Sequence, residues 1–239
     1  MQYGEIALVY DSLMYDIPYE DWAKFIGQNL KGRSVLELGC GTGSITEKLC
    51  AYYDITALDF SEDMLDIARE KLMKKGRMAR FIKGDMRDFK VHKPFENVII
   101  VCDGINYLTS LSDVKKTFLN VFDNLLPGGR FIFDISSQYK LKNMAGQLYS
   151  EDADEATYIW RNTMEGDIIT MDITFFVAED DTHYFRFDET HLQRAHSIEE
   201  ISALLCECGF EIISVTDNYT NNAVRDDSMR ITFCAEKKG

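Results

Sequence analysis

Three glycines in one short turn are the residues with the clearest chemical meaning in this 239-residue sequence. The apolar run from Val35 to Leu38 leads into Gly39-Cys-Gly-Thr-Gly43, and a segment with helical periodicity follows from Ser44. Such a turn lets a ligand lie against bare backbone at the start of a helix, because glycine has no Cβ to fill the ligand's volume. The spacing therefore predicts a site for a small molecule.

Two nucleotide-binding motifs fit this turn less well. The dinucleotide fingerprint Gly-x-Gly-x-x-Gly needs its third glycine at position 44, where this sequence has Ser44. The sequence therefore lacks the most diagnostic residue of a nicotinamide-dependent reductase. A phosphate-binding P-loop is excluded more firmly, because no Gly-Lys-Ser/Thr follows the glycines.

The glycine turn belongs to a regular alternation of expected strands and helices. After an amphipathic helix from Tyr19 to near Gly32, we expect strands at 34–38, 53–58, 79–82, 97–101 and 130–135. The intervening helices are expected to begin at caps Ser44 and Ser61 and at Ser112, and the last to end at Pro127-Gly-Gly129. This alternation is typical of a parallel sheet with helices on both faces.

The pattern changes in the segment from about 136 to 195. Residues 158–161, 168–177 and 184–187 are expected to form antiparallel strands without crossover helices, as an insertion over the open end of the sheet, where ligands bind in open α/β folds. A last helix opens with the capping box Ser197-x-x-Glu200 and stops at Gly209, and strands at 210–215 and 229–235 follow. We thus predict one α/β domain over 1–239, with a Rossmann-like, doubly wound, seven-stranded sheet.

Composition narrows the classes of protein and partner. Hydrophobic residues make up 46% and charged residues 28%, as in ordinary globular proteins, and no apolar run is long enough to cross a bilayer, so we expect a soluble cytoplasmic protein without a membrane partner. The net charge of −14 disfavours nucleic acid and favours small or cationic substrates. Six cysteines without a Cys-x-x-Cys indicate reduced thiols, and we predict no metal site.

The motif Glu37-Leu-Gly-Cys-Gly-Thr-Gly43 resembles the first motif of class I S-adenosylmethionine-dependent methyltransferases. The resemblance extends, in family order, to Leu58-Asp-Phe-Ser61, to Gly84-Asp-Met86 and to Leu126-Pro-Gly-Gly129, and it covers residues 30 to 135 closely. The segment from Arg194 to Phe210 is similar to the corresponding segment of small bacterial methyltransferases of this family, including those that methylate amines of sugars or amino acids. The resemblance implies S-adenosyl-L-methionine as cofactor and a small-molecule methyl acceptor as partner.

The resemblance also implies roles for residues around the turn. Asp59 would accept hydrogen bonds from the ribose hydroxyls and Asp85 from the adenine amino group, while Met64 and Met86 would sandwich the ring. Gly39, with Cys102 or Asp103, would face the methionine portion, and Tyr10 or Tyr15 would supply an aromatic ring over the cofactor. The implied cofactor-binding set is Tyr15, Glu37, Gly39, Cys40, Gly41, Gly43, Asp59, Phe60, Met64, Asp85, Met86 and Cys102.

Methyl transfer needs no acid and no protein nucleophile, because the carbon is already activated by a positive sulfur, so positioning can carry most of the catalysis. An acceptor amine or hydroxyl that loses a proton would use a base, for which Tyr10, Asp103, Tyr107 and His196 are the candidates. His196 directly precedes the Ser197 cap, a place that suits a structural hydrogen bond better. The alternative to an enzyme is a non-catalytic module that binds this nucleoside and regulates a partner.

Overall fold

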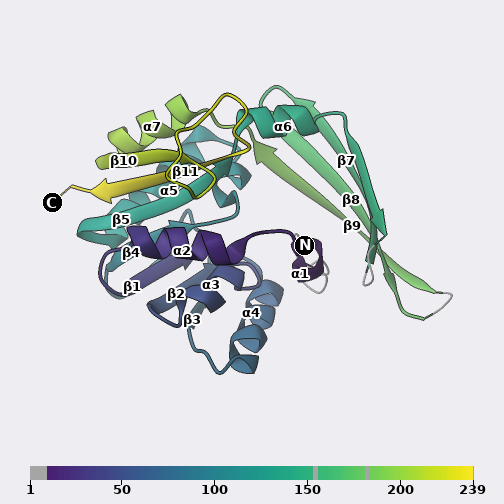
Figure 1. Cartoon of the computed structure of the whole chain (residues 1–239), viewed down its shortest axis with the longest axis horizontal. Helices are drawn as coiled ribbons and strands as arrows, with labels where there is room; N and C mark the ends of the chain where they lie inside the picture. Colours follow the sequence, from purple (N-terminus) through teal and green to yellow (C-terminus); the bar gives the residue numbers. More distant parts are fainter. Residues whose placement is uncertain (1–9, 153–155, 181–182, 239) are drawn as a thin grey trace.

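A computed structural model describes residues 10–152, 156–180 and 183–238 of the chain. Its larger sheet has seven strands in the order β10-β11-β5-β4-β1-β2-β3 (Figure 1). The strands of this sheet are β1 (Ser34–Leu38), β2 (Asp54–Asp59), β3 (Arg80–Lys83), β4 (Phe95–Ile100), β5 (Leu125–Ser136), β10 (Phe210–Asp217) and β11 (Arg230–Lys237). Strands β1 to β5 are parallel, and β11 runs antiparallel to both β5 and β10. The strand order departs in both directions from β1, which is the doubly wound arrangement that the sequence predicts.

Helices cover both faces of this sheet. One face packs on α2 (Tyr19–Asn29), α3 (Ser44–Leu49) and α4 (Glu62–Lys74), and the other on α5 (Leu111–Asn124) and α7 (Ile198–Glu207). Neighbouring strand residues divide between the two cores: Val35 joins the first and Leu36 the second, because successive side chains of a strand point to opposite faces. Strands buried on both faces therefore read as continuous apolar runs.

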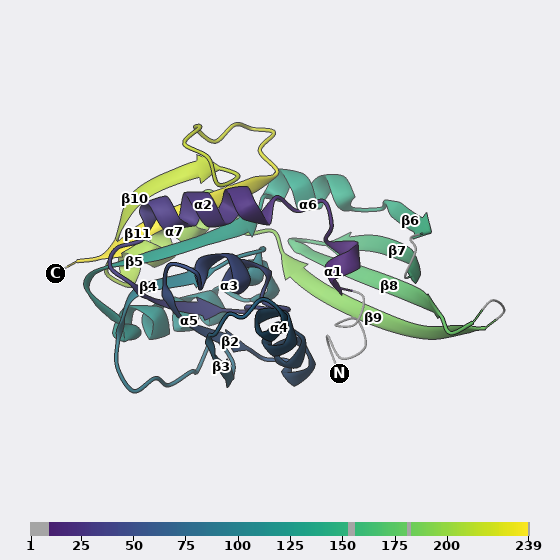
Figure 2. The same ribbon diagram turned by 60° about the horizontal axis from the view of Figure 1, so that its bottom comes forward.

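The smaller sheet is antiparallel and stands over the carboxyl ends of the parallel strands (Figures 1 and 2). It comprises β6 (Leu148–Asp152), β7 (Ala156–Glu165), β8 (Ile168–Ala178) and β9 (Tyr184–Arg194), and α6 (Gln138–Met144) joins it to β5. In β8, alternate residues from Ile169 to Phe175 are buried. We call the residues from α6 to β9 the cap. A short helix α1 (Tyr10–Leu13) lies between the cap and the larger sheet (Figure 2), and a 3₁₀ helix η2 (Gly104–Tyr107) contacts β5 and β9.

Several local predictions need correction. Ser44 is the first residue of α3 rather than its cap, a place that Gly43 takes in a left-handed conformation. The side chain of Ser110 caps α5, which begins before Ser112 and ends at Asn124, so Pro127-Gly-Gly129 lies inside β5. The first long helix ends at Asn29 and not near Gly32. The caps Ser61 and Ser197, the latter with its capping box, are confirmed. No helix in the described part of the chain is long and apolar enough to cross a membrane.

Candidate active site

A cavity of about 630 Å³ lies between the carboxyl ends of β1 to β4 and the apolar face of the cap. That volume is within the range of small-molecule sites in proteins. The sheet contributes Gly39, Asp59 and Cys102 to the cavity wall, and the cap contributes Trp160 and His191. The larger sheet and the cap thus each form one side of a single space.

The glycine turn forms the floor of this cavity. The backbone N–H groups of Gly39 and Cys40 donate to the Leu58 carbonyl, at 2.7 and 3.0 Å, and the N–H of Gly41 donates to Asp59 Oδ2 at 2.7 Å. Gly41 has φ of +53°, and a Cβ built there meets nothing within 4 Å, so it would project into the open space. The turn therefore offers bare backbone to a ligand, as its composition predicts.

Three residues assigned to the cofactor from the motif lie behind this floor rather than in the cavity wall. The buried carboxyl of Glu37 accepts from Thr46 Oγ1 at 2.5 Å, and burial raises its pKa to about 7. Cys40 is also buried, and the two residues border a minor recess of about 40 Å³ beside the main cavity. Gly43 has φ of +76°, and a Cβ there would lie 2.9 Å from the Ala68 Cβ, so it serves the packing of α3 on α4.

The two aspartates expected to hold the nucleoside follow neighbouring strands and both line the cavity. Burial raises the pKa of Asp59, and the backbone N–H groups of Ser61 and Gly41 partly offset this by donating to its oxygens. Asp85 is paired with the guanidinium of Arg87, with Nη2 to Oδ2 at 2.6 Å, and this bond lowers its pKa. Both side chains are acceptors, suited to hydroxyl and amino donors.

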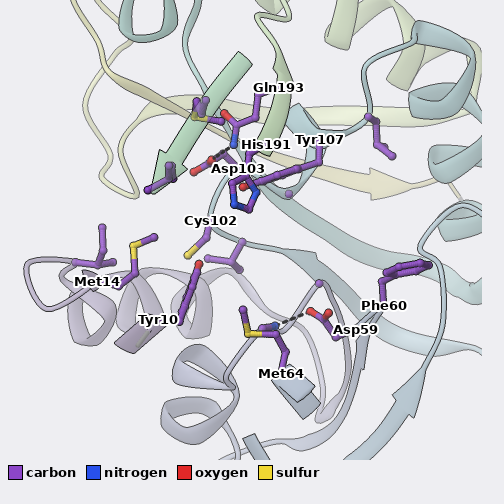
Figure 3. Close-up of a pocket in the computed structure, with 18 of the residues that line it drawn as sticks. Tyr10, Met14, Asp59, Phe60, Met64, Cys102, Asp103, Tyr107, His191 and Gln193 are labelled. Carbon is purple, nitrogen blue, oxygen red and sulfur yellow. Dashed lines mark hydrogen bonds between the residues drawn. The ribbon is translucent and has the colours of Figure 1, made fainter. Parts of the chain in front are cut away.

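Both methionines predicted from the motifs reach the cavity, as do two aromatic residues at its rim. The side chain of Met64 is buried in the wall, and Met86 Cε lies 3.4 Å from where a Cβ on Gly39 would be. Tyr15 and Phe60 are 73% and 68% exposed, so they border the mouth of the cavity; Figure 3 shows Phe60 apart from the other labelled side chains.

Asp103 is the centre of a buried charge cluster. Its oxygens accept from Gln193 Nε2 at 2.7 Å (Figure 3) and from Arg230 Nη2 at 2.8 Å, and its backbone N–H donates to Asp134 Oδ2 at 2.9 Å. Arg230 also pairs with Asp134 and stacks over the Trp22 ring. Burial raises the pKa of Asp103, but the charges of Arg230 and Lys140 and the hydrogen bonds from Gln193 and Arg230 together hold the pKa below its ordinary value. Asp103 is therefore an anion with both oxygens engaged.

The other base candidates separate into two groups. Tyr10 and Tyr107 line the cavity, and burial raises the pKa of Tyr10, so its phenol is neutral (Figure 3). His196 does not line the cavity: it is buried, with Nε2 3.0 Å from the Leu108 carbonyl. Its assignment as a base is thus corrected to a structural role. His191 is the histidine in the cavity wall, and burial lowers its pKa to about 4.

Three residues that line the cavity were not predicted from the sequence: Arg230, Gln193 and Lys140. One signal was present for the charge cluster: Asp134 interrupts an otherwise apolar strand, and a charge buried in a strand requires a partner. Neither Arg230 nor Gln193 carries such a signal, because their common partner Asp103 lies 127 and 90 positions away in the sequence.

An open α/β sheet with a glycine turn and a cavity at its strand ends is an architecture in which many enzymes bind a nucleotide or nucleoside cofactor. Residues 35–129 match the family described as a methyltransferase domain. YqeM of Bacillus subtilis (strain 168), assigned to the methyltransferases, is 38% identical over 99% of this chain and 98% of its own. A solved S-adenosylmethionine-dependent methyltransferase from Clostridium acetobutylicum is 36% identical, with a TM-score of 0.90 over 99% of both chains.

A more distant relative is the dTDP-3-amino-3,4,6-trideoxy-alpha-D-glucopyranose N,N-dimethyltransferase of Streptomyces venezuelae, which is 25% identical over 75% of this chain and 76% of its own. Together with the fold, these matches show that the chain belongs to the class I S-adenosylmethionine-dependent methyltransferases. S-adenosyl-L-methionine is the cofactor of this family.

Proposed function

We propose that this protein transfers a methyl group from S-adenosyl-L-methionine to an amine or hydroxyl of a small molecule bound under the cap. The observation that carries the proposal is the continuity of the cavity from the glycine turn to Trp160 and His191 on the cap. A module that only held the nucleoside would not need the further space under the cap. The relative from Streptomyces venezuelae, named for an amino-sugar acceptor, supports the same class of substrate.

The residues around the floor suit the cofactor by their chemistry. We assign Asp59 to the ribose hydroxyls and Asp85 to the adenine amino group, because each is an acceptor in the cavity wall. Met64 and Met86 supply polarizable apolar surface for the ring, and Gly39 and Gly41 leave space along the backbone. When bound, the cofactor supplies a methyl carbon activated by a positively charged sulfur.

The contribution of the chain itself is positioning and exclusion of water. Asp103 is held by Arg230 and Gln193 and is a poor proton acceptor, and the Tyr10 phenol is neutral. We therefore infer that an amine acceptor enters as the free base, and that Tyr10 and Tyr107 orient it by hydrogen bonding while the cap keeps water out. Orientation of this kind can supply most of the rate enhancement.

The test is turnover. The protein is incubated with S-adenosylmethionine and panels of amino sugars, other small amines and phenols, and S-adenosylhomocysteine is quantified by mass spectrometry against samples without acceptor. We expect acceptor-dependent release of S-adenosylhomocysteine and a methylated product. Tight binding of S-adenosylmethionine with no product across the panels would instead favour a regulatory module.

A further inference from the structure

Lys140 is a cation of the cavity wall that makes no direct ion pair with a carboxylate in the described part of the chain. It lies on α6, where Figures 1 and 2 both show the junction between the end of β5 and the cap. Within the part of the chain that the structure describes, its Nζ has one hydrogen-bond partner, Ser136 Oγ at 3.0 Å, and no carboxylate within ion-pair distance. An ammonium has three donors, so the ammonium is incompletely satisfied.

The other two Lys or Arg side chains in the cavity wall are already neutralised. Arg87 is paired with Asp85 at 2.6 Å, and Arg230 is paired with both Asp103 and Asp134. The charges of those two acids act on Lys140 without an ion pair, whereas both acids pair directly with Arg230. Lys140 is therefore the cavity cation that is available to an incoming anion.

The surroundings of Lys140 make an unpaired charge unfavourable. Burial lowers its pKa, and the charge of Asp103 only partly reverses this. Its helix neighbours Leu141 and Met144 pack with Met171 and Trp160 in an apolar cluster of the cap. A desolvated charge beside such a surface is stabilised by a ligand of opposite charge whose remaining body is apolar.

We propose that the Lys140 ammonium binds a carboxylate of the methyl acceptor, so that the acceptor is a small, largely apolar molecule with one negative charge. This inference rests on the proposed function, since it assigns the acceptor half of the same cavity. It differs from two other roles for Lys140: holding the carboxylate of the cofactor, or accepting a proton as a neutral amine.

The probes are 4-aminobenzoate and its uncharged analogue 4-aminobenzamide, which share the ring and the amine. Binding is measured by calorimetry and by fluorescence quenching of Trp160, in protein saturated with S-adenosylhomocysteine. Lys140→Met removes the charge, Lys140→Arg keeps it, and Lys142→Met is the matched control because Lys142 is exposed on the same helix. The Trp160→Phe variant identifies the fluorescence signal.

We expect the parent to bind the carboxylate at least about tenfold more tightly than the amide, and Lys140→Met to abolish this preference. Lys140→Arg should keep most of it, Lys142→Met all of it, and the affinity for S-adenosylhomocysteine should stay within about threefold in every variant. Loss of all 4-aminobenzoate binding in Lys140→Arg would contradict anion recognition.

Two further outcomes would overturn the proposal while leaving the proposed function intact. Equal binding of acid and amide, or no saturable binding of either, would show that the cavity does not select a carboxylate. A tenfold or greater loss of S-adenosylhomocysteine affinity in Lys140→Met would assign Lys140 to the cofactor instead. If the parent protein had no affinity for S-adenosylhomocysteine, the proposed function itself would be contradicted.

Discussion

At the scale of single residues, two glycines of one motif have different reasons to be glycine. Gly41 leaves open space above the cavity floor, whereas Gly43 permits close packing of α3 on Ala68 of α4. Both have positive φ, a conformation in which a Cβ costs about 1 to 2 kcal/mol. The motif alone assigns both glycines to the ligand, and the packing of Gly43 is visible only once α4 is in place.

The packing role of Gly43 predicts the effect of an added methyl group. Gly43→Ala should lower the free energy of unfolding by about 2 to 4 kcal/mol, because overpacking adds to the backbone strain. Gly76→Ala is the matched control: its φ is +64°, and its Cβ would meet nothing within 4 Å, so only the strain of about 1 to 2 kcal/mol remains. Urea denaturation measures both, and equal losses would show that the Ala68 contact is unimportant.

At the scale of elements, buried hydrogen bonds fasten the cap to the larger sheet. Asn106 in η2 donates from Nδ2 to the carbonyls of Ser136, at the end of β5, and of Arg194, at the end of β9, while its Oδ1 accepts from the Ser136 N–H. Gln193 of β9 adds its bond to Asp103. The fully buried amide of Asn106 thus makes three of the hydrogen bonds that link the cap to the larger sheet.

Removal of this amide should loosen the cap. We expect Asn106→Ala to lower the free energy of unfolding by about 2 to 4 kcal/mol, because it leaves buried carbonyl and N–H groups without partners. Hydrogen exchange should increase at the C-terminal end of β9 in particular. Asn143→Ala, at an exposed position of α6, is the control. Unchanged exchange at Arg194 in Asn106→Ala would show that the cap is held by other contacts.

Elements with strong local signals could be predicted from the sequence, and those without could not. The central strands of the larger sheet are mostly apolar, and the caps Ser61 and Ser197 mark helix starts. In contrast, α6 buries only Leu141 and β6 is mostly exposed, so neither has a periodic pattern to recognise.

Within the site, prediction succeeded where chemistry is encoded locally. Asp59 and Asp85 follow strands in recognisable motifs, and both line the cavity. The pairing of Asp103 with Arg230 spans 127 positions, and such a contact follows from strand pairing rather than from any local motif. Likewise, only the paired cap strands show that His191, and not the candidate His196, faces the cavity.

At the scale of the whole molecule, the free energy of unfolding should depend on pH because His191 is protonated more readily in the unfolded chain than in the folded protein. Burial lowers its pKa in the folded protein to about 4, whereas an unfolded chain binds the proton near pH 6.5. Protonation therefore favours unfolding, and the stability that neutral His191 gives above pH 6.5 is lost as the pH falls from there toward 4.

Because of this pKa shift, the free energy of unfolding should be about 2 kcal/mol lower at pH 5 than at pH 7.5. Replacement of the imidazole in His191→Gln should remove that part of the pH dependence, as measured by urea denaturation across the range. The exposed His92 provides the control variant, His92→Gln, which should keep the parental profile. A parental profile in His191→Gln would mean that the buried imidazole is not the group that titrates.

The central claim at this scale is that the glycine turn and two aspartates converge on one adenosine. Calorimetric titration of S-adenosylhomocysteine into the parent, Asp59→Ala and Asp85→Ala tests it most directly, with Asp54→Ala as a control at the exposed start of β2. We predict saturable binding by the parent and the control, and a loss of about tenfold or more in each of the other two. Parental affinity in Asp59→Ala and Asp85→Ala, or a parent with no affinity at millimolar ligand, would contradict the account.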